Sequence, residues 1–258
     1  MMSIHIETQG QGTDLILLPG WGMNGAVFEA FAGQLASFCR VHVVDLPGYG
    51  FTPWHVDYAA LPKMLTALER ELPAAGYLLG WSLGGMLAWK LALRQPQRWQ
   101  GVITMASSPR FVASEEWPGV RPMVLAGFEQ QLQQESARTV ERFLAIQAMG
   151  SPSAREDVRQ MKMRLESRPA ADAAALSAGL TWLESLDLRE ALSRLQVPSL
   201  SLFGRLDGLV PVAVMSQPCL QHPQLRTVCL TNSAHAPFLT EPDAVCQQLQ
   251  LFMSHPGR

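Results

Sequence analysis

The chain has 258 residues, of which 48% are hydrophobic and 16% are charged. This composition predicts a large buried core and excludes an intrinsically disordered chain. A formal net charge of −2 excludes a general attraction to nucleic acids or acidic membranes, so a charged partner would have to bind a local patch.

The N-terminal part of the chain alternates predicted strands with predicted helices. The hydrophobic pattern predicts strands at residues 4–8, 15–18, 41–45, 77–79 and 101–105, and helices at residues 27–38, 58–72 and 86–92. Strands and helices that alternate at this spacing are typical of βαβ units. We therefore expect an α/β fold, with a mostly parallel central sheet and helices on both faces.

The middle of the chain interrupts this alternation. From residue 111 to residue 184 the pattern is helical, and strands return at residues 198–204 and 225–230 before a last helix at 243–252. We therefore divide the chain into a first core segment, an inserted all-helical cap and a second core segment, at residues 1–110, 111–184 and 185–258.

A Gly-x-Ser-x-Gly motif lies between a predicted strand and a predicted helix, with Gly80, Ser82 and Gly84 as its fixed positions. A sharp strand-to-helix turn crowds the positions two before and two after the serine, where only glycine fits. Such a turn strains the serine and presents its hydroxyl at the carboxyl edge of the sheet. An ordinary turn is the alternative, but the flanking elements favour a nucleophilic serine.

Two loops that follow late strands carry the partners that a nucleophilic serine needs. Asp207 comes directly after the strand at 198–204, and His235 comes directly after the strand at 225–230. Taken alone, such an aspartate is typical of a turn, and a single histidine is typical of a surface or a core. The chain order Ser82, Asp207, His235 is that of a hydrolase triad. We expect His235 to take the serine proton and Asp207 to orient the imidazole.

The oxyanion that forms during ester hydrolysis needs hydrogen-bond donors already in place. The backbone N–H of Leu83, directly after the serine, is one expected donor. The glycine-rich loop after residue 18 should supply the second, and we assign it to Trp21, because Gly20 and Gly22 let that backbone bend inward. The Trp21 indole would also wall the acyl pocket; a packed loop aromatic is the alternative.

Other classes of site have no sequence signal. The cysteines form no C-x-x-C pair and no zinc-site spacing, so we expect reduced thiols at Cys39, Cys219, Cys229 and Cys246. We expect no metal and no cofactor, because phosphate-binding and dinucleotide-binding motifs are missing from the sequence. A signal peptide and an apolar run of roughly 20 residues are missing too, so we expect a soluble, cytoplasmic protein, and a monomer.

Six short motifs carry a resemblance to a known family: Gly-Trp-Ser-Leu-Gly-Gly (80–85), Ala-Ser-Ser-Pro (106–109), Glu-Trp-Pro-Gly (116–119), Val-Leu-Ala-Gly-Phe (124–128), Arg-Thr-Val-Glu-Arg-Phe-Leu-Ala (138–145) and Asp-Gly-Leu-Val-Pro (207–211). With them the chain resembles the α/β-hydrolase family over its whole length, and within it the pimeloyl-[acyl-carrier protein] methyl ester esterases of biotin synthesis. One departure is Pro19, where that family usually has histidine before the Gly-Trp of the oxyanion loop.

The resemblance implies hydrolysis of the methyl ester of pimeloyl-carrier protein to methanol and the free acid, with the acyl-carrier protein as partner. It implies that the cap stretch Phe143, Leu144, Ala145, Ile146 and Gln147 binds substrate together with Trp21, Ser82, Leu83 and His235. Apolar residues at helical spacing are more often core, which is the alternative for this stretch.

Carrier proteins are acidic, and the predicted cap carries two arginine pairs at four-residue spacing. Arg138 and Arg142 would share one helix face, and Arg155 and Arg159 another. A solvated helix face is the alternative, but the resemblance favours docking of the carrier through charge-assisted contacts.

Two rival functions remain open on the sequence. A general short-chain carboxylesterase, or a peptidase or carbon–carbon bond hydrolase with a cap, would share this scaffold and triad, because specificity lies in the cap and pocket. A non-catalytic binding module would use the pocket as a receptor, but an intact Ser82, Asp207 and His235 argues against it.

Overall fold

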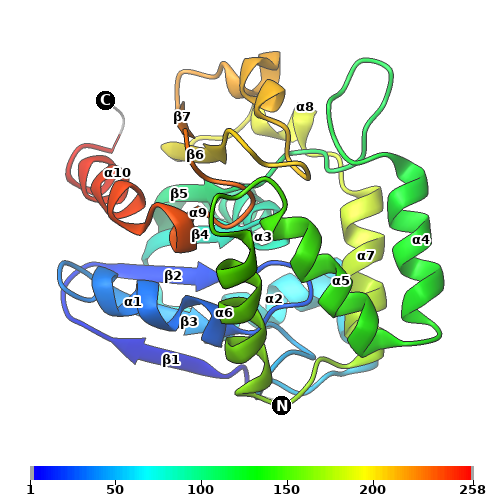
Figure 1. Ribbon diagram of the computed structural model, residues 1–258. Coiled ribbons are helices and arrows are strands. Elements are labelled where there is room, and N and C mark those ends of the chain that lie inside the picture. Colours follow the sequence, from blue (N-terminus) through cyan, green and yellow to red (C-terminus); the bar gives the residue numbers. More distant parts are fainter. Residues whose placement is uncertain (1–2, 257–258) are drawn as a thin grey trace.

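The computed structural model describes residues 3–256 of the chain. Its centre is a seven-stranded sheet (Figure 1). Its strands are β1 (Ile6–Gln9), β2 (Asp14–Leu18), β3 (Arg40–Val44), β4 (Gly76–Trp81), β5 (Trp99–Met105), β6 (Ser199–Gly204) and β7 (Leu225–Leu230). They lie in the order β1-β3-β2-β4-β5-β6-β7, and only the edge strand β1 is antiparallel to its neighbour. The prediction of a mostly parallel α/β sheet is confirmed.

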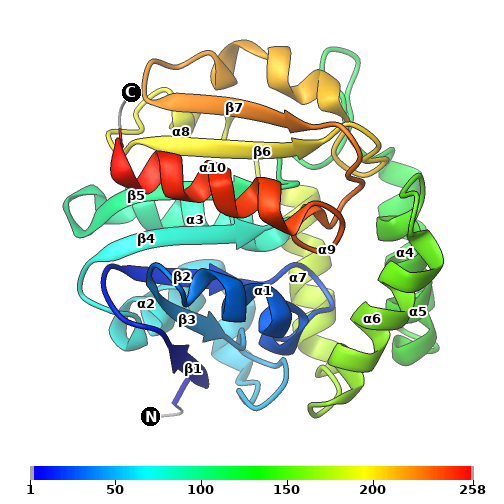
Figure 2. The ribbon, with the colours of Figure 1, turned by 60° about the vertical axis from the view of Figure 1, so that its left-hand side comes forward.

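Helices cover both faces of this sheet (Figure 2). On one face lie α1 (Glu29–Leu35) and α10 (Pro242–Ser254), and on the other lie α2 (Leu61–Glu71), α3 (Leu83–Arg94) and α8 (Arg189–Leu192). The short α9 (Pro237–Thr240) precedes α10, and 3₁₀ helices occupy Gly25–Phe28 (η1), Val56–Ala59 (η2), Pro96–Arg98 (η3), Val212–Ser216 (η4) and Pro218–Leu220 (η5). In α2 the buried residues Leu61, Met64, Leu65 and Leu68 recur at the spacing of one helix face.

Four further helices lie between β5 and β6 in the chain: α4 (Pro122–Leu132), α5 (Ser136–Ala148), α6 (Ala154–Glu166) and α7 (Ala173–Ser185). We call them the cap helices. In Figure 2 the arrowheads of β4, β6 and β7 point toward the side on which α4, α5 and α6 lie. The cap helices therefore stand at the carboxyl edge of the sheet, which is where ligands bind in open α/β sheets.

The segment before α4 differs from its prediction as helix. Residues 111–121 form a loop closed by isolated bridges between Val112 and Val120 and between Ser114 and Trp117. The two ends of this loop pack closely at Gly119. A Cβ there would lie 2.5 Å from the carbonyl oxygen of Phe111, so only glycine fits. Prolines at 118 and 122 further disfavour helix in this stretch, so the first cap helix begins only at residue 122.

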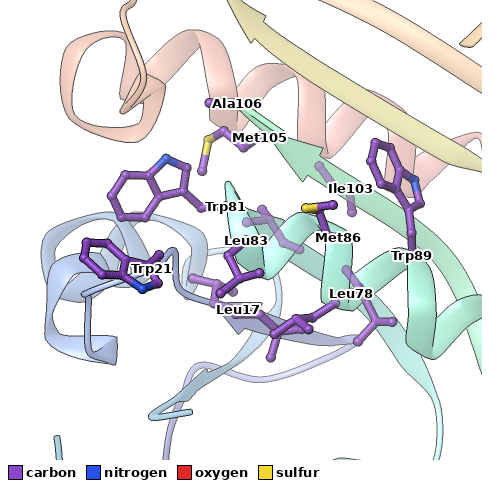
Figure 3. Close-up of a cluster of buried hydrophobic side chains, with 14 of the residues drawn as sticks. Leu17, Trp21, Leu78, Trp81, Leu83, Met86, Trp89, Ile103, Met105 and Ala106 are labelled. Atoms are coloured by element: carbon purple, nitrogen blue, oxygen red, sulfur yellow. The ribbon is translucent and has the colours of Figure 1, made fainter. Parts of the chain in front are cut away.

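The core is centred on the strands of the sheet and on α3. Figure 3 shows the side chains of this buried cluster, among them Leu17, Leu78, Trp81, Leu83, Met86, Trp89, Ile103 and Met105. Nine of the twelve residues of α3 are buried, as expected of a helix packed between sheet and neighbouring helices. The turn that joins β4 to α3 is thus held rigidly from both sides.

The four cysteines form no disulfide. All four are free thiols, with Cys39 buried and the others half-buried. Burial raises the pKa of Cys39 to about 12 and that of Cys246 to about 11, so both thiols stay protonated at neutral pH. Among residues 3–256 no helix is long and apolar enough to cross a membrane.

Candidate active site

Ser82 forms the tip of the turn between β4 and α3, with backbone angles φ 55° and ψ −118°. Such a conformation costs a non-glycine residue about 1–3 kcal/mol and persists only where its surroundings enforce it. A Cβ on Gly80 would lie 2.1 Å from the carbonyl oxygen of Gly84, and one on Gly84 would lie 2.1 Å from that of Leu18. The crowding that the motif predicts is therefore present, and it holds the Ser82 backbone in place.

The fold brings three distant polar residues together at this turn. His235 Nε2 lies 2.9 Å from Ser82 Oγ, and His235 Nδ1 lies 2.8 Å from Asp207 Oδ2. All three side chains are buried. This is the hydrogen-bonded chain of nucleophile, base and orienting carboxylate that activates a serine.

Neighbouring groups fix the base and the carboxylate. The second oxygen of Asp207 accepts the backbone N–H groups of Leu209 at 2.8 Å and Val210 at 2.9 Å, which sets the plane of the carboxylate. The Trp81 indole donates to the His235 carbonyl oxygen at 2.6 Å. The imidazole is therefore held by its backbone as well as by Asp207.

The loop of residues 19–24, which we call the oxyanion loop, lies against the serine. A Cβ on Gly20 would lie 3.2 Å from the Cβ of Ser82, so this glycine permits the close approach. Within residues 3–256, the backbone N–H groups of Trp21 and Leu83 donate no hydrogen bond to another protein group. Two free donors beside an activated serine are what a developing oxyanion requires.

The Trp21 side chain is packed against the cap. Its indole is fully buried, donates to the carbonyl oxygen of Leu176 at 2.8 Å and packs edge-on against Phe143 with ring centroids 4.8 Å apart. Beneath it Tyr49 is also buried, and burial raises the pKa of this phenol, which therefore stays neutral. The side chain is a packed aromatic, while the backbone N–H of the same residue stays available.

Comparison with known proteins agrees with this geometry. The sequence model of the alpha/beta hydrolase fold matches residues 14–242. The chain belongs to the α/β-hydrolase family. It is 49% identical over 254 residues to a protein of Aeromonas hydrophila, covering 98% of this chain and 100% of that one, and 48% identical over 253 residues to a protein of Vibrio parahaemolyticus, covering 97% and 98%. Both relatives are named pimeloyl-[acyl-carrier protein] methyl ester esterase.

Solved structures of other α/β-hydrolases share the fold at low sequence identity. An esterase from Exiguobacterium antarcticum superposes with a TM-score of 0.86 at 21% identity, covering 97% of this chain and 95% of that one. An enol-lactonase from Burkholderia xenovorans gives a TM-score of 0.83 at 18% identity, covering 98% and 96%. These likenesses show the architecture alone.

One supporting residue of this hydrolase was missed by sequence reasoning. Ser107 Oγ donates to the carbonyl oxygen of Ser82 at 2.7 Å, and so holds the nucleophile turn from the end of β5. Ala106, beside it, has φ 48°, a second strained residue at the site. The only sequence signal was the Ala-Ser-Ser-Pro motif, which served as a family marker and was given no structural role.

The cap stretch predicted to bind substrate is only partly turned inward. Phe143, Leu144 and Gln147 are buried, Ile146 is half-buried and Ala145 is exposed. The structure therefore does not support Ala145 as a lining residue. It lies two positions from the buried Phe143 and Gln147, so its side chain points in another direction, toward solvent. Among residues 3–256, neither polar atom of the buried Gln147 amide has a hydrogen-bond partner, although the Gln147 carbonyl oxygen accepts the His235 N–H at 3.2 Å.

The four predicted docking arginines lie exposed on the two cap helices α5 and α6, which pack against each other. Arg138 pairs with Glu135 at 3.3 Å and Arg159 with Glu156 at 2.6 Å, each within one exposed helical turn. Solvent screens such exposed pairs, which therefore contribute little to stability, so a charged partner can displace them. Arg142 donates to the neutral amide of Gln131 at 2.7 Å.

Among the residues of the described range, no cluster of three His, Cys, Asp or Glu side chains is arranged to hold a metal ion.

Proposed function

We propose that this α/β-hydrolase cleaves the terminal methyl ester of pimeloyl-[acyl-carrier protein], releasing methanol, in a cytoplasmic step of biotin synthesis. The chain is a carboxylic ester hydrolase, as its family relatives are. The observation that carries the proposal is the buried chain Ser82–His235–Asp207, with contacts of 2.9 and 2.8 Å, in a sequence 49% identical to an esterase of that name over nearly its full length.

In the proposed reaction each group has one role. His235 Nε2 takes the proton of Ser82 Oγ as that oxygen attacks the ester carbonyl, and the N–H groups of Trp21 and Leu83 donate to the resulting oxyanion. The protonated His235 then gives its proton to the departing methoxide, which leaves as methanol. Water attacks the acyl-enzyme with His235 again as base, and Ser82 is released with the free acid.

The interior under the cap supports an extended acyl substrate. A cavity of about 310 Å³ lies between Gly22 of the oxyanion loop and the cap helices. Apolar residues such as Val140, Leu144 and Leu176 line most of it, and the charged residues Glu141, Lys162, Glu166 and Arg168 line the rest. Its volume is at the lower end of the range for small-molecule sites, and its mainly apolar wall suits a methylene chain. We propose that this cavity, with Phe143 and Gln147, receives the acyl arm.

The proposal is tested by measuring methanol release from methyl pimeloyl-carrier protein beside free dimethyl pimelate. Docking contacts made only by the carrier should raise kcat/KM for the bound ester by about 100-fold, which corresponds to roughly 2.7 kcal/mol. Turnover of both esters at the same efficiency would instead indicate a general short-chain carboxylesterase. Failure of a fluorophosphonate to label the folded protein would indicate a non-catalytic binding module.

Replacing Arg138 and Arg142 by alanine tests the docking face. We expect kcat/KM for the carrier-bound ester to fall roughly 10–30-fold, because two charge-assisted contacts and part of the electrostatic steering are lost. The loss should be larger at low ionic strength, where the charges are less screened, and dimethyl pimelate should be unaffected. Steady-state rates at two salt concentrations measure both effects.

The matched control removes the same charge elsewhere. Arg40 and Arg70 are exposed residues of β3 and α2, outside the cap helices, and their double alanine variant should turn over the carrier-bound ester normally. An equal loss on carrier-bound and free ester in the Arg138/Arg142 variant would contradict docking, and so would an equal loss in the control.

Gln147 offers a test with opposite effects on stability and activity. A buried amide without a partner among the described residues costs about 1–3 kcal/mol, so the nearly isosteric Gln147→Met should raise the Tm of the free protein by roughly 2–12 °C. If the amide binds a carbonyl of the substrate, kcat/KM for the carrier-bound ester should fall roughly tenfold. Calorimetry and the methanol assay measure the two changes; a higher Tm with unchanged kcat/KM would remove Gln147 from the substrate site.

A further inference from the structure

The oxyanion loop is hydrogen-bonded to the cap by two of its side chains. Trp21 Nε1 donates to the carbonyl oxygen of Leu176 in α7 at 2.8 Å, and Asn24 Nδ2 donates to that of Leu165 in α6 at 3.0 Å. Both side chains are buried, with exposed fractions of 0% and 1%. The position of the loop therefore depends on where the cap helices lie.

A third link between this loop and the cap passes through a buried carboxylate. The N–H of Gly25, directly after the loop, donates to Asp45 Oδ1 at 2.6 Å. The other oxygen of Asp45 accepts Arg168 Nη1 at 2.9 Å, and Arg168 comes from the segment between α6 and α7. Asp45 is fully buried and the Arg168 side chain is 7% exposed, so the pair is shielded from solvent.

The loop itself has few polar groups that could hold it in another way. In residues 19–24, which read Pro-Gly-Trp-Gly-Met-Asn, only Trp21 and Asn24 have side chains that donate hydrogen bonds, and both donate to the cap. Pro19 has no N–H and no polar side-chain atom. The other atom of the Asn24 amide, Oδ1, accepts the N–H of Ala26 at 3.1 Å and caps η1. Asn24 thus joins the core to the cap with a single side chain.

The partner of Asn24 lies on a helix that also carries two docking arginines. Arg155 and Arg159 stand near the start of α6, and Leu165 stands in its last turn, where its carbonyl oxygen also accepts the backbone N–H of Ser167 at the end of the helix. At 1.5 Å per residue, Leu165 is about 15 Å along the helix from Arg155. A displacement of α6 as a unit would therefore be transmitted to the oxyanion loop.

We propose that Asn24 is a positioning residue, which ties the oxyanion loop to α6 so that the Trp21 N–H is in place only when the cap is seated. The proposal rests on the ester hydrolysis of the proposed function, and it needs no carrier protein. A donor that is loosely placed stabilises the oxyanion less, whereas the uncharged substrate gains little from it. Loss of the tie should therefore lower kcat and leave KM nearly unchanged.

The test is Asn24→Ser, whose hydroxyl can still accept the Ala26 N–H and cap η1 but is too short to reach the Leu165 carbonyl. With p-nitrophenyl butyrate, and active sites counted by fluorophosphonate labelling, we expect kcat to fall about tenfold and KM to change less than about twofold. Affinity for an alkyl trifluoromethyl ketone, which binds serine esterases as an oxyanion, should fall by the same factor as kcat. The Tm should fall by no more than about 4 °C.

Two further variants keep the result decisive. Glu29→Gln removes the ion pair between α1 and Arg164 of α6, a contact of cap and core outside the loop, and should keep normal kcat. Asn24→Asp keeps the acceptor for Ala26 but cannot donate to Leu165, so it replaces Asn24→Ser if that variant fails to fold. An unchanged kcat per labelled site, or an equal loss in Glu29→Gln, would overturn the proposal. Serine-dependent turnover of the butyrate ester is independent of any carrier preference, so failure of the substrate assignment leaves this test valid.

Discussion

Ser82→Ala is expected to lower kcat on the carrier-bound ester by a factor on the order of 10⁴–10⁶. Without the hydroxyl no acyl-enzyme can form, and His235 has only water to activate. The oxyanion donors of Trp21 and Leu83 remain, so a small rate above the uncatalysed reaction should persist. Methanol release measured over hours, against an enzyme-free blank, covers this range.

The same substitution should leave the fold intact, which makes the loss interpretable. Alanine and serine both have a Cβ, so the backbone at φ 55° is strained to the same extent in both proteins. The Ser107 hydroxyl still donates to the carbonyl oxygen of residue 82. The Tm should therefore stay within about 2 °C of the wild-type value. Retention of one hundredth or more of the wild-type kcat by a folded variant would exclude Ser82 as the nucleophile.

The triad could be predicted because its members lie where topology forces them together. In a parallel sheet the carboxyl ends of β4, β6 and β7 meet at one edge, so the residues that follow these strands must be near one another. Ser82, Asp207 and His235 each follow one of these strands. The only other feature that had to be predicted was the sharp turn at Ser82, and the glycines around this residue indicate it.

The role of the cap in holding the site could not be predicted in the same way. The contacts of Asn24 and Trp21 with Leu165 and Leu176 join residues 141 and 155 positions apart, through backbone carbonyls that any sequence would supply. Helical periodicity showed that residues 143–147 belong to a helix, but the inward face was set by packing, which left Ala145 outside. Tertiary packing, which periodicity does not specify, decided both features.

Pro19 stands where the resemblance to the esterase family led us to expect a histidine. A histidine there could hold the oxyanion loop by its own side chain, whereas Pro19 gives the loop fixed backbone geometry and no hydrogen bond. The loop of this hydrolase is instead held by bonds from Trp21 and Asn24 to the cap. Pro19 and the ties to the cap therefore concern the same loop.

Asp207→Asn is expected to lower kcat about 10⁴-fold on every ester, through the tautomer of His235. Oδ1 of Asp207 accepts the N–H groups of Leu209 and Val210 at 2.8 and 2.9 Å, so an asparagine must point its oxygen at these donors. Its NH₂ group then faces His235 Nδ1 and donates to it, which places the imidazole proton on Nε2. That nitrogen cannot accept the proton of Ser82.

Control of the imidazole tautomer by Asp207 predicts an unusual order of kcat and stability among the variants. Asp207→Asn keeps both loop hydrogen bonds and should be nearly as stable as the wild type, whereas Asp207→Ala loses them and should unfold at a lower temperature. Yet alanine leaves the imidazole free to adopt either tautomer, so its kcat should equal or exceed that of Asp207→Asn. Kinetics with p-nitrophenyl butyrate, together with ¹⁵N NMR of the histidine ring, measure the rates and the tautomer. An Asp207→Asn variant within tenfold of wild type, or one that is clearly faster than Asp207→Ala, would show that the carboxylate does not act by fixing the proton on Nδ1.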